Sequence, residues 1–260
     1  MRNQPKIKLS RNFIVNDIHV HVGPSNDIFK TLPIEKLLEF MKQYDVNEAA
    51  VMPFEIQTDL DNQRIIKMSK EHNSIHGLYW IQKHRIEEDL DILRKELSNG
   101  LIGIKFHGAF ERLPITDSIY TPILELISDT KSIILIHCGR FKDGNPESDT
   151  SFEHGLTLAK KFSKIKVVLA HMGGNATSIV KKAVNATKDY HNVFFDTSGI
   201  STPYRVEYAV KVIGPDRIIF GSDYPWCSYL GNYYNVEDSL LDEKIIQKIF
   251  FDNFQNLVGK

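Results

Sequence analysis

The stretch DIHVHVG at residues 17–23 places two histidines in an otherwise apolar, β-branched segment. In a β-strand successive side chains point to opposite faces, so Asp17, His19 and His21 share one face and the apolar residues between them share the other. On a half-exposed strand the polar face would simply meet water, whereas on a buried strand two histidines need a partner. Two interpretations therefore stand at this point, a metal site and a solvated strand face.

Eight short apolar or β-branched runs recur along the chain, at residues 13–22, 49–54, 75–81, 101–107, 132–138, 166–172, 192–198 and 217–223. Segments with helical periodicity lie between them, and Pro33 and Pro122 fall where two helices are expected to begin. Strands that alternate with crossover helices pair in parallel, and nearly continuous apolar strands are buried on both faces. The pattern predicts a (β/α)8 TIM barrel that occupies residues 1–260 as one domain. An open doubly wound sheet is the alternative, but no glycine-rich dinucleotide-binding turn follows the first strand.

Charge and cysteine content exclude several classes of protein. The formal net charge is -1, from 32 basic and 33 acidic side chains, so no overall field favours nucleic acid or an anionic membrane. The two cysteines, Cys138 and Cys227, form neither a disulfide framework nor a Cys-x-x-Cys pair. No apolar run is long enough for an export signal or a membrane span. We expect a cytoplasmic protein that binds neither nucleic acid nor membrane.

Polar side chains gather at the ends of the predicted strands. In a (β/α)8 barrel the active site lies at the carboxyl ends of the strands, so polar residues there indicate chemistry rather than packing. Seven residues occupy such positions: His19, His21, Lys105, His107, His137, His171 and Asp223. The other five histidines fall in predicted helices or loops, where a solvated or capping role is ordinary: His72, His76, His84, His154 and His191.

A divalent metal ion would account for the polar strand ends. His19, His21, His137 and Asp223 could converge on one ion and leave a position for water, which the metal would acidify. Without a metal, several imidazoles and a carboxylate would be buried together with poor compensation for their lost hydration. Zinc suits this mixture of ligands best, and manganese or iron would also accept it.

Six motifs give the chain a resemblance to a known family: DIHVHVG (17–23), IKFHGAF (104–110), ILIHCG (134–139), LAHMGG (169–174), FGSDYPW (220–226) and FFDNFQNLVG (250–259). Together they resemble the amidohydrolase superfamily, and most closely the amidohydrolase-related group that includes aminocarboxymuconate-semialdehyde decarboxylase and several lactone hydrolases. The resemblance runs from about residue 13 to residue 259. It implies a metal held by His19, His21, His137 and Asp223, with His171 beside the metal-bound water as an acid/base group.

These residues suggest a mechanism. Asp223 could accept the proton of the metal-bound water, while His171 stabilises or protonates the developing charge and the metal polarises a substrate carbonyl. Asp223 also lies in a sequence that is typical of a turn, so the alternative to metal binding is a structural role in that turn. In some members of the superfamily a lysine on the fourth strand is carboxylated and bridges two metals, but the mononuclear group that this chain resembles does not depend on it. We therefore expect one metal.

Several further residues are candidates for binding substrate. Lys105 could neutralise a substrate carboxylate and His107 could donate a hydrogen bond near the mouth, although a buried polar pair within the scaffold explains both equally well. Arg140 begins a polar loop that is long enough to cover the site and could clamp a carboxylate; an outward salt bridge is its ordinary alternative. Tyr224 and Trp226 begin the aromatic segment 224–235 and could wall an apolar pocket.

The function that the sequence favours is hydrolysis of a small organic acid, lactone or amide by a metal-activated water. Hydrolysis needs only a polarised carbonyl, whereas the alternative, non-oxidative decarboxylation, needs an unsaturated or aromatic acid. A non-catalytic barrel that binds a ligand at its mouth is the third hypothesis, and it is disfavoured because every predicted metal ligand and His171 are present. The expected partner is a small-molecule substrate, and the sequence is compatible with a homodimer.

Overall fold

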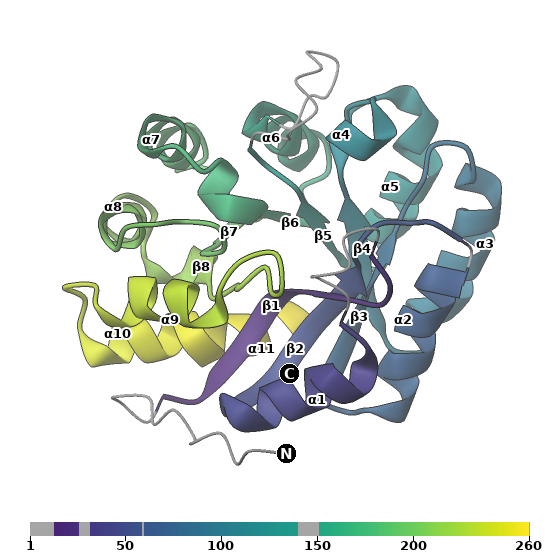
Figure 1. The fold of residues 1–260 in the computed structure, drawn as a ribbon. Coiled ribbons are helices and arrows are strands. Elements are labelled where there is room, and N and C mark those ends of the chain that lie inside the picture. The colour runs from purple at the N-terminus through teal and green to yellow at the C-terminus, as the bar shows by residue number, and fades with distance from the viewer. Residues whose placement is uncertain (1–12, 26–31, 59, 140–150, 260) are drawn as a thin grey trace.

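The computed structural model describes residues 13–25, 32–58, 60–139 and 151–259, and it confirms the predicted (β/α)8 barrel (Figure 1). Eight parallel strands follow one another around a single sheet in chain order. They are β1 (Val15–Val22), β2 (Val46–Pro53), β3 (Ile75–Trp80), β4 (Leu101–Phe106), β5 (Ile133–Ile136), β6 (Lys166–Leu169), β7 (Val193–Asp196) and β8 (Ile218–Ile219).

The segment after β8 joins the last strand to the first. The strand β8 is shorter than the apolar run 217–223 that predicted it, because the chain leaves β7 and continues beside β1. The amide of Ile18 donates to the carbonyl of Phe220 over 3.0 Å, and the amide of His21 donates to the carbonyl of Tyr224 over 2.8 Å. These bonds bring the two ends of the sheet together, and they place Asp223 next to β1.

Helices surround the sheet on its outer side (Figure 1). They are α1 (Ile34–Gln43), α2 (Leu60–Glu71), α3 (Ile86–Glu96), α4 (Gly108–Glu111), α5 (Thr121–Asp129), α6 (Phe152–Lys161), α7 (Thr177–Ala186), α8 (Tyr204–Ile213), α9 (Tyr229–Glu237), α10 (Glu243–Gln247) and α11 (Asn253–Val258). Pro33 is the N-cap residue of α1 and Pro122 lies in the first turn of α5, as the sequence predicts. Among the described residues, none of the helices combines the length and the apolar character needed to cross a membrane.

The strands are buried on both faces, as their apolar composition predicts. Phe40 and other helix residues belong to a large cluster that fills the space between the strands and the helices. A smaller cluster contains Ile133 and Leu135 of β5 together with Phe254 of α11, and it fills the inside of the barrel. Because side chains alternate along a strand, His137 falls on the same face as Ile133 and Leu135. The end of β5 therefore points His137 into the barrel mouth.

The expectation that His76 occupies a helix or loop is wrong. His76 lies in β3 and is buried, with its Nε2 2.5 Å from Glu48 Oε2 on β2. Gln255 Nε2 donates to the other oxygen of Glu48 over 2.9 Å, and the ring of Phe254 lies 5.5 Å from that of His76. The carboxylate of Glu48 satisfies the imidazole inside the sheet, at the end of the strands opposite the candidate site.

We expect Gly103→Ala to destabilise the barrel. A Cβ at Gly103 of β4 would lie 2.0 Å from the carbonyl oxygen of Ile133 on the neighbouring strand β5. Overpacking of this kind costs roughly 1–3 kcal/mol or more, which urea denaturation followed by circular dichroism would measure. Gly231→Ala is the matched control, because a Cβ at Gly231 would make only ordinary contacts in α9. Alanine also stabilises a helix by about 1 kcal/mol relative to glycine. Equal unfolding midpoints for the two variants would contradict the prediction.

Candidate metal centre

Three of the four predicted metal ligands meet at the barrel mouth. His19 Nε2 lies 3.2 Å from His21 Nε2 and 3.4 Å from Asp223 Oδ1, and His21 Nε2 lies 3.3 Å from Asp223 Oδ1. Four ligands held tetrahedrally at about 2.0–2.1 Å from a zinc ion are about 3.4 Å apart, so these spacings fit a shared metal. In the described part of the chain, no other group of at least three His, Cys, Asp or Glu residues brings its ligand atoms this close together. We call these three residues the ligand triangle.

Hydrogen bonds hold both imidazoles of the ligand triangle in the form that binds metal. His19 Nδ1 lies 2.8 Å from Asp196 Oδ2, and His21 Nδ1 lies 2.7 Å from the carbonyl oxygen of Pro53. A carbonyl oxygen and a carboxylate accept hydrogen bonds, so each Nδ1 carries the hydrogen and each Nε2 presents a lone pair. Burial lowers the pKa of His19 to about 4 and also lowers that of His21, which keeps both rings neutral.

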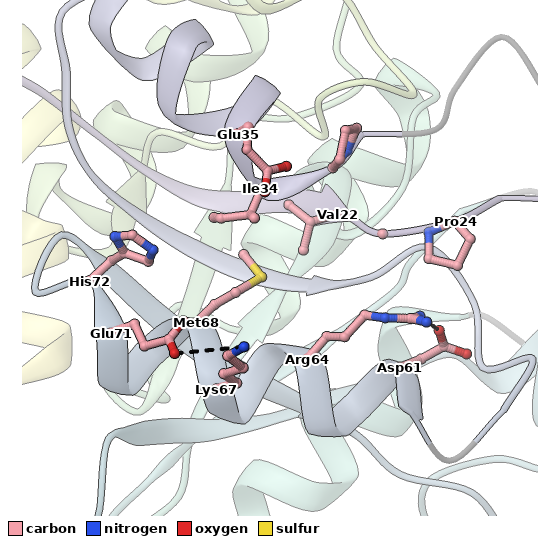
Figure 2. A pocket seen from close by; sticks show the side chains of 12 residues that line it. Val22, Pro24, Ile34, Glu35, Asp61, Arg64, Lys67, Met68, Glu71 and His72 are labelled. Carbon is pink, nitrogen blue, oxygen red and sulfur yellow. Dashed lines mark hydrogen bonds and ion pairs between the residues drawn. The ribbon is translucent and has the colours of Figure 1, made fainter.

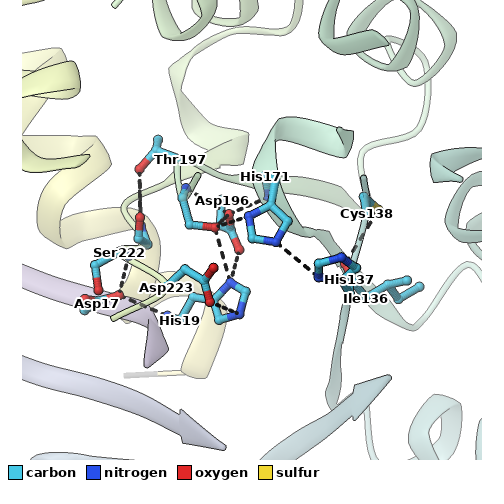
Figure 3. A network of polar contacts seen from close by, with 12 residues as sticks. Asp17, His19, Ile136, His137, Cys138, His171, Asp196, Thr197, Ser222 and Asp223 are labelled. Atoms are coloured by element: carbon cyan, nitrogen blue, oxygen red, sulfur yellow. Dashed lines mark hydrogen bonds and ion pairs between the residues drawn. The ribbon is translucent and has the colours of Figure 1, made fainter. Parts of the chain in front are cut away.

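Asp17 connects, through hydrogen bonds, the two segments that carry the ligand triangle: β1 and the segment after β8. Its Oδ1 accepts hydrogen bonds from the amide of His19 over 3.0 Å and from the amide of Ser222 over 2.9 Å (Figure 3). The amide of Asp223 in turn donates to the carbonyl of His19 over 2.8 Å. Asp17 is fully buried, and burial raises its pKa to about 7. Residues that are far apart in sequence are thus joined at the two positions that supply ligands.

Gly221 lets the chain pass between β1 and β7 on its way to Asp223. A Cβ at this position would lie 3.1 Å from Asp196 Cβ and 3.2 Å from His19 Cβ, closer than most side chains allow. Asp223 itself adopts a left-handed backbone conformation with φ 55°. Burial alone would raise the pKa of Asp223, but the positive charge that His19 and His21 carry when they are protonated outweighs burial and holds this pKa well below its usual range.

His137, the fourth predicted ligand, lies beside the ligand triangle but not within it. Its Nδ1 is 3.2 Å from His171 Nε2, and its ring stacks on that of His107 at 3.9 Å. Its Nε2 is buried and has no hydrogen-bond partner among the described residues. A lone pair in this position fits a metal ligand, and metal binding by His137 stays a prediction.

Lys105 and His107 both lie at the mouth. Lys105 is fully buried, and its Nζ is 3.1 Å from His19 Nε2, next to the ligand triangle. Burial lowers the pKa of Lys105 to about 8. The ring of His107 lies between those of Trp80 and His137, with interplanar angles of 6° and 12°. Of the two, Lys105 lies where it could balance a negative charge on a bound substrate.

Four aromatic residues, which we call the mouth aromatics, form a connected set of ring contacts with His21 and His107: Phe54, Trp80, Phe110 and Trp226. The ring of His21 lies 5.8 Å from that of Phe54 and 6.5 Å from that of Trp80. Phe54 contacts Trp226 at 5.5 Å, and Trp80 contacts Phe110 at 5.6 Å. Phe110 and Trp226 remain 42% and 39% exposed, so their rings are accessible to a ligand.

Two predicted substrate contacts remain, Tyr224 and Arg140. Tyr224 stacks on Phe40 of α1 with 4.1 Å between ring centroids, which gives it a packing role between the helix and β1. Tyr229 and Tyr233 of the same aromatic segment belong to the buried core. Arg140 lies outside the described residues. Substrate binding by Tyr224 and Arg140 stays a prediction from the sequence.

Asp196 and Ser198 belong to the site but are not among the residues predicted from the sequence. Asp196 ends β7, so the same strand-end argument that selects the histidines applies to it. Burial by itself would raise its pKa, but His19, His171 and the hydroxyl of Ser198 outweigh burial and lower it to about 2. Ser198 Oγ lies 2.9 Å from His171 Nδ1 and 2.5 Å from Asp196 Oδ1. A serine two residues after a strand carries no sequence signal that distinguishes it from a turn residue.

A cavity of about 460 Å³ lies outside the candidate metal centre, between the end of β1, the start of α1 and the helix α2 (Figure 2). Two of its cations are paired with acids on α2: Arg64 Nη1 lies 2.6 Å from Asp61 Oδ1, and Lys67 Nζ lies 3.8 Å from Glu71 Oε1. None of the predicted site residues lines this cavity. The chemistry therefore concentrates at the ligand triangle.

Comparisons with known proteins agree with this architecture. The family model described as Amidohydrolase matches residues 17–259. A search of curated protein sequences gives no match. The structure of 2,6-dihydroxybenzoate decarboxylase from Rhizobium has a TM-score of 0.77 and 13% identity, with 95% of this chain and 98% of that chain covered.

Two further solved structures share the fold. Dihydroxybenzoic acid decarboxylase from Polaromonas sp. JS666, with bound manganese and the inhibitor 2-nitroresorcinol, has a TM-score of 0.73 and 17% identity over 95% of this chain and 97% of that chain. 4-Oxalomesaconate hydratase from Rhodopseudomonas palustris has a TM-score of 0.68 and 18% identity over 94% and 95%. At these identities the similarity shows a shared fold.

Replacing Asp17 should loosen the junction between β1 and the segment after β8. Asp17→Ala leaves the buried amides of His19 and Ser222 without their acceptor, at a cost of roughly 1–3 kcal/mol for each. Asp17→Asn keeps a side-chain oxygen in the same place and should lose clearly less stability. Chemical denaturation of the two metal-free variants measures the difference, and an equal loss in both would show that Asp17 does not act as this acceptor.

Proposed function

The chain belongs to the amidohydrolase family, and from this premise we propose that it is a metal-dependent decarboxylase of small, flat carboxylic acids. One observation carries the proposal: the ligand triangle lies beside the buried amine of Lys105, and two of the mouth aromatics, Phe54 and Trp80, contact its His21. Flat apolar walls favour a conjugated ring or chain, and a buried cation favours an anionic group on it. The solved structures of decarboxylases that share this fold support the same proposal.

We propose one divalent metal ion, held by His19, His21 and Asp223 with His137 as a fourth ligand. Neutral imidazoles and a carboxylate suit zinc, and manganese, which the Polaromonas enzyme binds, accepts the same donors. When bound, the ion would polarise a substrate oxygen and stabilise the negative charge that develops as carbon dioxide leaves.

The protein residues then position the substrate and handle the proton. Phe110 and Trp226 would fix the plane of the substrate, and Lys105 would balance an anionic oxygen. Loss of carbon dioxide breaks the carbon–carbon bond and leaves its electron pair on the substrate carbon. A His171 side chain that has taken up a second proton gives one to that carbon in place of the lost carboxylate and returns to its neutral form, which balances the reaction.

Hydrolysis of a lactone or amide is the second candidate, and the position of Asp223 favours it. Its Oδ1 belongs to the ligand triangle, and its Oδ2 lies 3.6 Å from the thiol of Cys227. A carboxylate at that point could accept the proton of an attacking water molecule. The cytoplasmic location, the lack of nucleic-acid or membrane binding and the homodimer stay predictions from the sequence.

Metal analysis tests the ligand triangle. The purified protein should carry about one equivalent of a divalent metal, and His19→Ala should lose most of it because one of the three close ligands is gone. His191→Ala removes an exposed imidazole and should keep the metal. Elemental analysis by mass spectrometry after gel filtration gives both values. Full occupancy in His19→Ala would contradict the proposed centre.

Product analysis separates the reactions. The metal-loaded protein should release carbon dioxide from members of a panel of hydroxybenzoic and unsaturated carboxylic acids. His171→Ala should lower that rate by about 10²–10⁴-fold, the usual contribution of an acid/base group. Incorporation of labelled water into lactones or amides without release of carbon dioxide would establish hydrolysis instead. A loaded protein that transforms neither class would support a binding barrel.

A further inference from the structure

We propose that Ser198 is a positioning residue whose hydroxyl fixes the hydrogen of His171 on Nδ1 and, through His171, leaves a lone pair on Nε2 of His137. The role of that lone pair in holding a metal rests on the function proposed above. The hydrogen positions themselves follow from the described contacts alone.

Asp196 Oδ1 has three close hydrogen-bond donors. The amide of His171 donates over 2.8 Å (Figure 3). The amide of Ser198 donates over 3.0 Å and its hydroxyl over 2.5 Å. Backbone amides can only donate, so this oxygen acts as an acceptor. The single hydrogen of the Ser198 hydroxyl therefore points at Asp196.

The direction of that hydroxyl decides the state of His171. Ser198 Oγ also lies 2.9 Å from His171 Nδ1. With its hydrogen directed at Asp196, the oxygen can only accept, so His171 must donate from Nδ1. A neutral His171 then has a lone pair on Nε2.

His171 in turn decides the state of His137. His171 Nε2 lies 3.2 Å from His137 Nδ1, and a lone pair on the first requires a hydrogen on the second. A neutral His137 is then left with a lone pair on Nε2. This is the buried nitrogen that has no hydrogen-bond partner among the described residues. It is also the atom of His137 that would bind the metal.

One carboxylate therefore orders both sides of the site. Asp196 Oδ2 holds the hydrogen of His19 on Nδ1, and Asp196 Oδ1 acts on His171 and His137 through Ser198. His171 has a left-handed φ of 56°, and its amide contacts Asp196 while its ring contacts Ser198. A Cβ at Gly199 would lie 2.8 Å from His171 Nδ1, so the ring can approach Ser198 only if residue 199 is glycine.

Nitrogen NMR of the metal-free protein tests the proposal directly. In protein labelled with ¹⁵N-histidine, two-bond correlations show which ring nitrogen carries the hydrogen. At a pH where the rings are neutral, His171 and His137 should both be in the Nδ1–H form. Ser198→Ala should shift His171 toward the other form or into exchange between the two, and Ser198→Thr, which restores a hydroxyl, should return it to Nδ1–H.

Metal affinity gives a second measurement. Partners that orient metal-binding histidines are worth about 10–100-fold in affinity, so chelator competition with zinc should show a loss of that order in Ser198→Ala and recovery in Ser198→Thr. Ser239→Ala is the matched control, since it removes a buried hydroxyl bonded to the carbonyl of Val236 over 2.6 Å outside the site. It should change neither the spectra nor the affinity.

Wild-type His171 in the Nε2–H form would overturn the proposal without any variant. An unchanged His171 spectrum in a folded Ser198→Ala protein would also overturn it. If the spectra agree with the proposal but the wild-type protein binds no divalent metal, the positioning role stands and the metal-dependent function fails.

Discussion

Asp196 Oδ2 accepts a hydrogen bond from His19 Nδ1 over 2.8 Å, at a depth where neither side chain reaches solvent. A buried carboxylate is costly unless donors surround it, and Asp196 receives them from His19, from Ser198 and from the backbone of His171. Removing any one of these donors would leave the buried charge with fewer partners. The histidines and the carboxylate therefore stabilise one another, and the orientation needed for metal binding is also the arrangement that satisfies the buried charge.

The barrel makes this arrangement available by bringing strand ends together. His19 on β1 and Asp223 after β8 are separated by most of the chain, yet Asp223 N lies 2.8 Å from His19 O because the segment after β8 runs beside β1. The same geometry places Lys105 at the end of β4 within 3.1 Å of His19. Because the strands are parallel and pair in chain order, residues at their carboxyl ends lie close together at one rim of the barrel.

The sequence could predict the strands and most of the polar rim because both depend on local pattern. Apolar runs mark buried parallel strands, and the polar residue that ends each run marks the rim, which is how His19, His137 and Asp223 were found. The hydrogen-bond partners of these residues could not be predicted, because no local sequence pattern shows that Ser198 faces His171. Likewise, the burial of His76 depends on Glu48 from another strand, and the stacking of Tyr224 depends on a helix. Hydrogen-bond partners and side-chain packing are set by tertiary contacts, which a single sequence does not display.

Backbone conformation explains how the site keeps its shape. His171, Met172 and Asp223 all have left-handed φ values between 55° and 56°, a region in which residues other than glycine cost roughly 1–3 kcal/mol each. Hydrogen bonds compensate for part of this cost, since Asp196 accepts from the amide of His171 and the carbonyl of His19 accepts from the amide of Asp223. A strained backbone held by buried partners has few alternative positions. The ligand triangle is therefore formed by the fold itself, and a metal ion would enter a site whose atoms already have the required spacing.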